Sequence, residues 1–187
     1  MAKIIVIVIV IIVFYLVYSY FSSQAGAQLV SMHNARETII LKQEDLEEQS
    51  SSDYTFSIWF AVDNWDYQYG ERKAIFERRN KDNKLVPGVY FDEKINNIIV
   101  KTETTGSDET FECSLENVPL QKWSNLIISV NDRNMELYLD GKLVKTCILS
   151  GVPEQATDSM VHITPGSDND SNKFGFGGFV SNFRHIG

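Results

Sequence analysis

Aromatic and acidic side chains gather in one short stretch, Asp-Asn-Trp-Asp-Tyr-Gln-Tyr-Gly-Glu at residues 63–71. Aromatic rings in an exposed loop stack on sugars or anchor protein interfaces, where Trp and Tyr are over-represented among the residues that carry binding energy. We therefore predict Trp65, Tyr67 and Tyr69 as the binding residues. The alternative is that Trp65 and Tyr67 only close the end of the folded domain.

Three residues are candidates for covalent chemistry. A bridge between the two cysteines, Cys113 and Cys147, would close a loop of about 35 residues, and chain-entropy estimates put its contribution at about 3–4 kcal/mol. In a domain outside the cytosol we predict this disulfide, and two buried thiols are the alternative. Asn169 begins the only N-glycosylation sequon, in a stretch rich in Pro, Gly, Asp and Asn that is expected to be exposed.

Apolar and polar side chains alternate along most of the chain after residue 53, most clearly in Phe56–Phe60, Leu126–Val130 and Met135–Leu139. A period of two predicts half-buried strands, and frequent turn residues between many short strands predict a two-sheet antiparallel β-sandwich. Asp140-Gly141 predicts a hairpin with a type I′ turn, because both central residues of that turn need positive φ. The further expected strands are Ile75–Arg78, Val89–Phe91, Ile98–Thr102, Thr110–Leu115, Leu143–Leu149, Met160–Ile163 and Phe179–Arg184.

An uncharged apolar run of 18 residues precedes these strands, from Ile4 to Phe21. As a helix it would span about 27 Å, close to the roughly 30 Å of a hydrocarbon core, and a lone strand in lipid would leave its backbone groups unpaired. We predict a transmembrane helix over residues 1–21 that contacts the lipid bilayer through residues 4–21, then a stalk at 22–37. The anchor residues are Ile4, Val10, Tyr15, Tyr18 and Phe21.

The alternative for this segment is a secretory signal that is cleaved near Ala25-Gly26-Ala27. Both alternatives leave the N-terminus with Lys3 in the cytosol and the acidic remainder of the chain on the translocated side. The chain carries 17 Lys and Arg against 25 Asp and Glu, a formal net charge of −8. We expect no nucleic-acid partner, because such proteins need a basic surface.

Four segments, in the same order along residues 38–187, resemble the concanavalin A-like, or laminin G-like, superfamily. The segments are Phe56–Phe60, Val118–Leu126, Leu137–Lys142 and Gly178–Arg184. The resemblance implies that residues 38–187 form a two-sheet antiparallel jelly-roll sandwich. In this superfamily the last strand returns beside the first, which is expected here at Thr38–Leu41.

Glycosidases of this superfamily carry a Glu-x-Asp-x-x-Glu motif, because retaining hydrolysis needs two carboxylates about 5–5.5 Å apart. The motif is absent here, and the acidic runs Asp108–Glu112 and Glu44–Glu48 do not match it. No Gly-x-Ser-x-Gly sequence occurs either, and the three histidines lie far apart without a metal spacing: His33, His162 and His185. We therefore predict that the chain is not an enzyme.

Many relatives bind calcium through loop carboxylates, which must converge on one point. The residues that would supply such ligands are Asp63, Asp66, Asp168 and Asp170, although no spacing in the sequence requires the site. We expect no cofactor, with Ca²⁺ as the alternative.

The apolar N-terminal run, the loop after Asp63 and the segment Pro119–Trp123 together resemble membrane-anchored laminin G-like proteins that large DNA viruses of algae and protists encode. This resemblance implies a minor capsid protein in the internal membrane of the virion, with the sandwich facing capsid or other coat proteins. We therefore predict a non-catalytic structural protein that links a membrane to a protein layer. The alternative is a lectin-like surface module that binds glycans.

Overall fold

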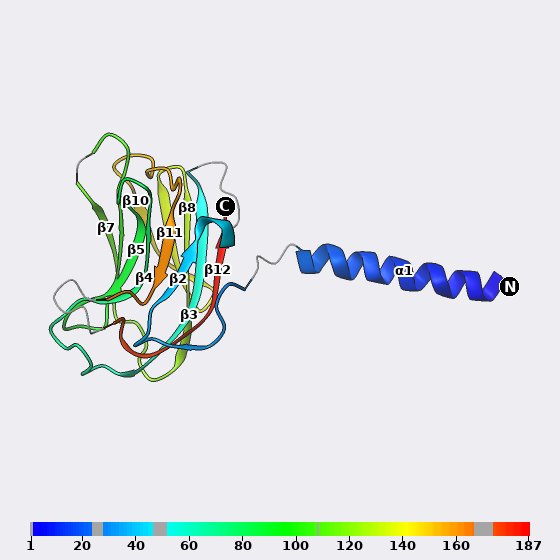
Figure 1. Cartoon of the computed structure of the whole chain (residues 1–187), viewed down its shortest axis with the longest axis horizontal. Helices are drawn as coiled ribbons and strands as arrows, with labels where there is room; N and C mark the ends of the chain where they lie inside the picture. Colours follow the sequence, from blue (N-terminus) through cyan, green and yellow to red (C-terminus); the bar gives the residue numbers. More distant parts are fainter. Residues whose placement is uncertain (1, 24–27, 47–51, 108, 167–173) are drawn as a thin grey trace.

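The computed structural model describes residues 2–23, 28–46, 52–107, 109–166 and 174–187, and within α1 it describes the side chains of residues 7–19 only. One helix is followed by a β-sandwich (Figure 1). The elements are α1 (Ala2–Ser23), β1 (His33–Asn34), β2 (Ile39–Lys42), η1 (Gln43–Asp45), β3 (Tyr54–Asn64), β4 (Lys73–Arg79), β5 (Leu85–Phe91), β6 (Ile98–Thr102), β7 (Phe111–Leu115), β8 (Trp123–Asn131), β9 (Asn134–Leu139), β10 (Lys142–Ile148), β11 (Met160–Ile163) and β12 (Gly177–Ile186).

The strands form two six-stranded antiparallel sheets that pack face to face. The first has the order β1-β12-β3-β8-β9-β10, and the second has the order β2-β11-β4-β5-β6-β7. The expected two-sheet antiparallel sandwich is therefore confirmed. Asp140 and Gly141, which connect β9 to β10, have φ values of 49° and 77°, as the type I′ turn requires.

Alternation along β3 explains how the core is assembled. Phe56, Ile58 and Phe60 point inward and are fully buried, while the side chains between them point outward. Rings from both sheets meet at this layer, with the Phe56 centroid 5.3 Å from that of Phe76 on β4. Tilted aromatic pairs of this kind stabilise a core by about 0.5–1.5 kcal/mol beyond the burial of their area.

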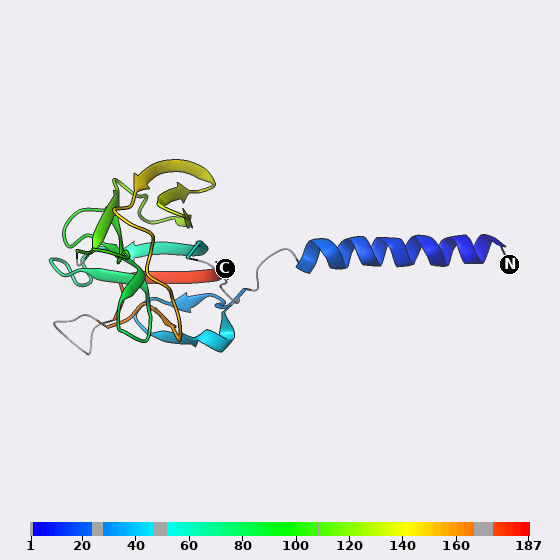
Figure 2. The same cartoon turned by 90° about the horizontal axis from the view of Figure 1, so that it is seen from above.

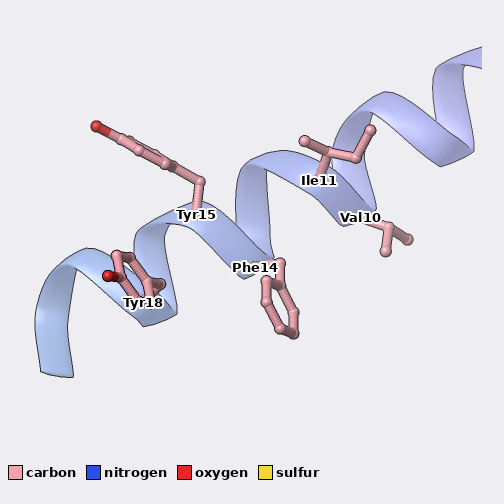
Figure 3. Close-up of a pocket in the computed structure, with 5 residues that line it drawn as sticks. All are labelled: Val10, Ile11, Phe14, Tyr15 and Tyr18. Atoms are coloured by element: carbon pink, nitrogen blue, oxygen red, sulfur yellow. The ribbon is translucent and has the colours of Figure 1, made fainter. Parts of the chain in front are cut away.

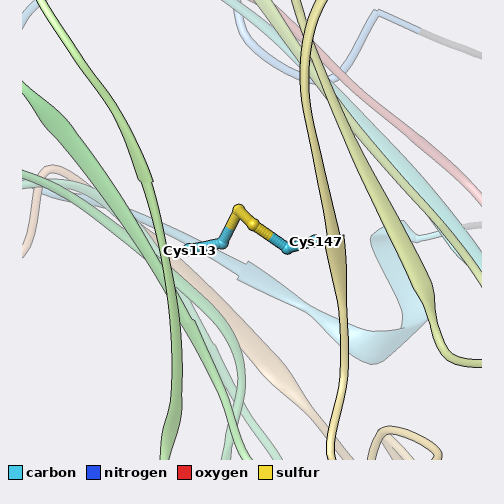
Figure 4. The surroundings of a disulfide bond; sticks show 2 residues. All are labelled: Cys113 and Cys147. Carbon is cyan, nitrogen blue, oxygen red and sulfur yellow. A yellow bond between two sulfur atoms is a disulfide. The ribbon is translucent and has the colours of Figure 1, made fainter.

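A disulfide joins Cys113 on β7 to Cys147 on β10, with Cα atoms 6.2 Å apart (Figure 4). β7 and β10 are the last strands of their respective sheets. The bond therefore ties the two sheets together along one side of the sandwich.

The prediction that the last strand lies beside Thr38–Leu41 is wrong. β12 pairs with β1 and β3, whereas β2, which contains most of Thr38–Leu41, pairs with β11 in the opposite sheet. The reason is that the chain crosses between the sheets at residues 35–38. The backbone N–H of Ala35 still bonds to the first sheet at the carbonyl of Gly178, and the hydroxyl of Thr38 already donates to the carbonyl of Thr164 beside the second sheet.

The N-terminal apolar segment is helical, as α1, and lies apart from the sandwich in both views (Figures 1 and 2). Within the part of the chain that the structure describes, no helix has the length and apolar character needed to cross a bilayer. The predicted transmembrane anchor is therefore not supported. Val10, Tyr15 and Tyr18 are exposed. The side chains of Ile4 and Phe21 lie outside the described residues.

Candidate functional site

Three large aromatic side chains share the outer face of the first sheet: Trp59 on β3, Trp123 on β8 and Phe179 on β12. Ala61 pairs with both Trp123 and Phe179, and Ser181 pairs with Trp59, so the pleat directs all of these side chains outward. Trp59 is 38% exposed and Trp123 is 40% exposed. We call Trp59, Trp123 and Phe179 the outer aromatic surface.

Two hollows flank Trp123. The first has a volume of about 320 Å³ and is lined by Trp59, Trp123, Ser181 and Asn182. The second has a volume of about 350 Å³, and its lining residues are Ala61, Val62, Asp63, Gln121, Lys122 and Trp123. The indole of Trp123 lines both hollows. Polar side chains, such as Asn182 in the first hollow and Gln121 in the second, therefore lie on either side of this apolar ring.

Unusual backbone geometry positions one polar residue at each hollow. Asn182 has a φ of 51° and Gln121 a φ of 58°, a left-handed conformation that non-glycine residues rarely adopt. A register shift in β12 between Ser181 and Arg184 inserts Asn182, whose N–H donates to the carbonyl of Val30 at 2.8 Å. Bulges and left-handed residues of this kind are concentrated at binding sites, because they redirect side chains at a cost in backbone strain.

The cation at the second hollow, Lys122, is paired with the carboxylate of Asp140. Lys122 Nζ lies 3.0 Å from Asp140 Oδ2, and the backbone N–H of Asn125 donates to Asp140 Oδ1 at 2.9 Å. The Asn125 N–H and the Lys122 ammonium keep the pKa of Asp140 below its usual value. Asp140 is therefore ionised at neutral pH and holds the ammonium group near the hollow.

Trp65, which the sequence favoured as a binding residue, lies against the core. Its ring is edge-on to Phe91, with centroids 5.8 Å apart, and its Nε1–H donates to the carbonyl of Lys94 at 3.4 Å. The ammonium of Lys73 sits 4.4 Å from the indole centroid. Lys73 is fully buried and desolvation lowers its pKa. These contacts favour the alternative that Trp65 closes the end of the sandwich.

The other two predicted binding residues, Tyr67 and Tyr69, differ in their exposure to solvent. Tyr67 is half-buried and stacks under the guanidinium of Arg36, 4.6 Å from its centroid. Tyr69 is 59% exposed. The structure therefore does not bring Trp65, Tyr67 and Tyr69 together as one surface comparable with Trp59 and Trp123.

The candidate calcium ligands are only partly described. Asp63 borders the second hollow and Asp66 is exposed in the next turn, whereas Asp168 and Asp170 lie outside the described residues. Within the described ranges no three His, Cys, Asp or Glu side chains form a group that could hold a metal ion. The glycosylation candidate Asn169 also lies outside the described residues.

Sequence reasoning missed Trp59 and Trp123, although the signal was present. Trp59 lies between Ile58 and Phe60, at a position whose parity places it on the solvent side of a half-buried strand. A tryptophan in that register is exposed, and this makes Trp59 a binding candidate. What the sequence could not give is the pairing of β3 with both β8 and β12.

Comparison with known proteins agrees with this fold. No curated protein matches the sequence. The mouse laminin α1 chain domains LG4-5 superpose with a TM-score of 0.62 at 8% identity, covering 88% of this chain and 44% of that one. The binding domain of botulinum neurotoxin DC in complex with rat synaptotagmin II gives a TM-score of 0.58 at 11% identity, covering 80% and 36%.

A third similar structure concerns botulinum neurotoxin type C, whose cell entry depends on interaction with two ganglioside molecules. That structure superposes with a TM-score of 0.58 at 13% identity, covering 80% of this chain and 36% of that one. The chain thus spans less than half the length of these structures. A family model described as the concanavalin A-like lectin/glucanases superfamily matches residues 35–185. That match covers most of the chain, so the chain belongs to the concanavalin A-like lectin/glucanases superfamily.

Proposed function

We propose that this chain is a non-catalytic glycan-binding domain and that the outer aromatic surface is its sugar site. The observation that carries the proposal is the pair of exposed indoles, Trp59 and Trp123, which border one hollow together with Ser181 and Asn182. Indole rings offer a flat apolar face and a polar edge, which suits the apolar faces of sugar rings. Ser181 and Asn182 supply the hydrogen-bonding groups that fix orientation in such sites.

The second hollow extends the site to more than one sugar unit. Trp123 borders it as well, and Gln121, Lys122 and Asp63 provide donors and acceptors. An oligosaccharide lying across Trp123 would contact both hollows. Its negatively charged groups, if present, would meet the ammonium of Lys122. One of the similar structures is a binding domain in complex with rat synaptotagmin II, and another concerns a toxin whose cell entry depends on two ganglioside molecules, which supports a binding role for a domain of this fold.

The test is a glycan array probed with the full-length chain in mild detergent, followed by the Trp59→Ala and Trp123→Ala variants. Both substitutions are expected to lower binding to any glycan that the native chain recognises by about ten-fold or more. Tyr69→Ala is the matched control, since it removes an exposed ring from the loop at residues 63–71. Loss with Tyr69→Ala and retention with Trp59→Ala would move the site to that loop, and no glycan signal at all would overturn the proposal.

A second candidate function is attachment through α1, in keeping with the predicted structural role as a minor capsid protein whose N-terminus is cytosolic. The observation that favours attachment is the exposed apolar surface of the helix. Val10, Ile11, Phe14, Tyr15 and Tyr18 line a recess of about 380 Å³ along it (Figure 3). Exposed apolar patches of this kind mark contact with a membrane or a partner protein. We propose a lipid surface as the partner.

Flotation of the full-length chain with phosphatidylcholine vesicles tests the attachment. Val10→Asp with Phe14→Asp is expected to abolish flotation. The matched control, Met32→Asp with Ile40→Asp, makes the same charge change at two exposed apolar residues outside the helix and is expected to leave flotation unchanged. Equal flotation of both double variants would contradict attachment through α1.

A further inference from the structure

β10 is the last strand of the first sheet and presents one edge to solvent. Within the described residues it pairs with β9 alone. Its apolar side chains are unusually exposed, with Leu143 at 52%, Val144 at 43% and Ile148 at 68%. An edge strand carries a row of backbone N–H and C=O groups that can pair with another extended chain. β10 therefore offers both backbone groups and apolar contact area to a partner.

The register of the hairpin shows which side chains a partner strand would meet. Leu143 pairs with Tyr138 and Thr146 with Glu136, so Leu143, Thr146 and Ile148 lie on the outward face. Lys145 and Cys147 pair with the inward-facing Leu137 and Met135. A strand added beside β10 would therefore meet apolar groups on one face and lysine on the other.

The positive charge of β10 favours an acidic partner segment at this edge. The segment Lys142–Ile148 contains two lysines and no acidic residue, although the chain as a whole has a formal net charge of −8. A second copy that paired antiparallel about Lys145 would place the two Lys145 ammonium groups opposite each other, which is unfavourable. An acidic extended segment, by contrast, gains attraction from both lysines.

The edge is also held rigid before a partner arrives. The Asp140-Gly141 turn fixes the start of β10, and the disulfide from Cys147 to Cys113 fixes its end against β7 (Figure 4). A preorganised strand loses less conformational entropy on binding than a flexible one. We propose that β10 is a protein-docking edge, which receives an acidic, alternately apolar segment of a partner protein as an additional strand.

This edge is separate from the outer aromatic surface, so its test can fail without affecting the glycan proposal. The probe is a fluorescent nine-residue peptide of alternating Val and Glu, with an alternating Val and Lys peptide for comparison. Fluorescence anisotropy with the full-length chain at pH 7 is expected to show binding of the Glu peptide only. Lys142→Glu with Lys145→Glu is expected to weaken that binding about ten-fold or more.

The matched control is Lys81→Glu with Lys94→Glu, which makes the same change in net charge at exposed loop lysines away from β10 and is expected to bind normally. Amide hydrogen exchange of β10 distinguishes strand addition from attraction between charges alone, since only strand addition protects its backbone N–H groups. Equal loss in both double variants, unchanged exchange of β10, or no binding of the Glu peptide would each overturn the proposal.

Discussion

The guanidinium of Arg78 on β4 lies 3.3 Å from Nε2 of His185 on β12, in the core between the two sheets. Arg78 also donates to Ser159 Oγ at 2.9 Å, and the ring of His185 lies against Phe56 with centroids 4.7 Å apart. A guanidinium can only donate hydrogen bonds, so Nε2 of His185 is the acceptor and the imidazole is neutral. Burial, and then the charge of Arg78, lower the pKa of His185 to about 4.

The first prediction is that acid destabilises the fold through His185. Its pKa is lower in the folded chain than in the unfolded chain, where it is about 6.5, so the unfolded chain binds more protons between these values. The stabilisation is complete above about pH 6.5 and is lost as the pH falls toward 4, by about 3 kcal/mol in all. Urea denaturation at several pH values measures this loss.

The control for that prediction is His185→Gln, which has no titrating side chain. Carboxylates also contribute to acid denaturation, but they are common to both proteins. The native chain is therefore expected to lose more stability than the variant between pH 7 and pH 4.5. Parallel curves would show that the buried Arg78–His185 contact does not govern the pH dependence.

The second prediction separates two roles of the loop at residues 63–71. Because Trp65 packs on Phe91 and under the ammonium of Lys73, Trp65→Ala is expected to lower the free energy of unfolding by about 2–4 kcal/mol. Tyr69→Ala, at an exposed position, is expected to change it by less than about 0.5 kcal/mol. Urea denaturation of both variants measures the difference, and similar values for the two would contradict the structural role of Trp65.

Sequence patterns sufficed for those parts of the fold that depend on local chemistry. The alternation in Phe56–Phe60 predicted a half-buried strand, and Asp140-Gly141 predicted the turn between β9 and β10, because both signals act through neighbouring residues. The partner of the last strand was predicted wrongly, since it depends on where the chain crosses between sheets. That crossing lies at residues 35–38, which carry no strong signal in the sequence.

The candidate site shows the same contrast between features that local sequence predicts and features that depend on strand pairing. The loop aromatics were predicted as a site because they are close in sequence. Trp59 and Trp123 are 64 positions apart and meet only through the pairing of β3 with β8. Parity alone could have shown that Trp59 is exposed. Asn182 was not predictable, since its place at the hollow depends on a bulge in β12.

The third prediction concerns the disulfide. Replacing Cys113 and Cys147 by Ser is expected to lower the free energy of unfolding by about 2–4 kcal/mol, because the bond closes a loop with a sequence separation of 34. Amide exchange in β10 is expected to rise more than in β3, which lies in the interior of its sheet. Mass spectrometry of alkylated protein, with and without reduction, checks that the bond is present in the native chain. A native chain that alkylates fully without reduction would contradict this assignment.

The fourth prediction tests whether Asn182 serves the backbone or the ligand. Glycine adopts a positive φ freely, so Asn182→Gly is expected to keep the bulge and to change the free energy of unfolding by less than about 1 kcal/mol. The loss of the amide is expected to weaken glycan binding about ten-fold, a typical effect of removing one hydrogen-bonding group from a site. Asn182→Val is expected to lower stability by about 1–3 kcal/mol, because a β-branched residue is strained at this φ. Denaturation and glycan titration of both variants measure these effects. Normal glycan binding by a stable Asn182→Gly variant would remove Asn182 from the proposed site and leave it only a role in shaping β12.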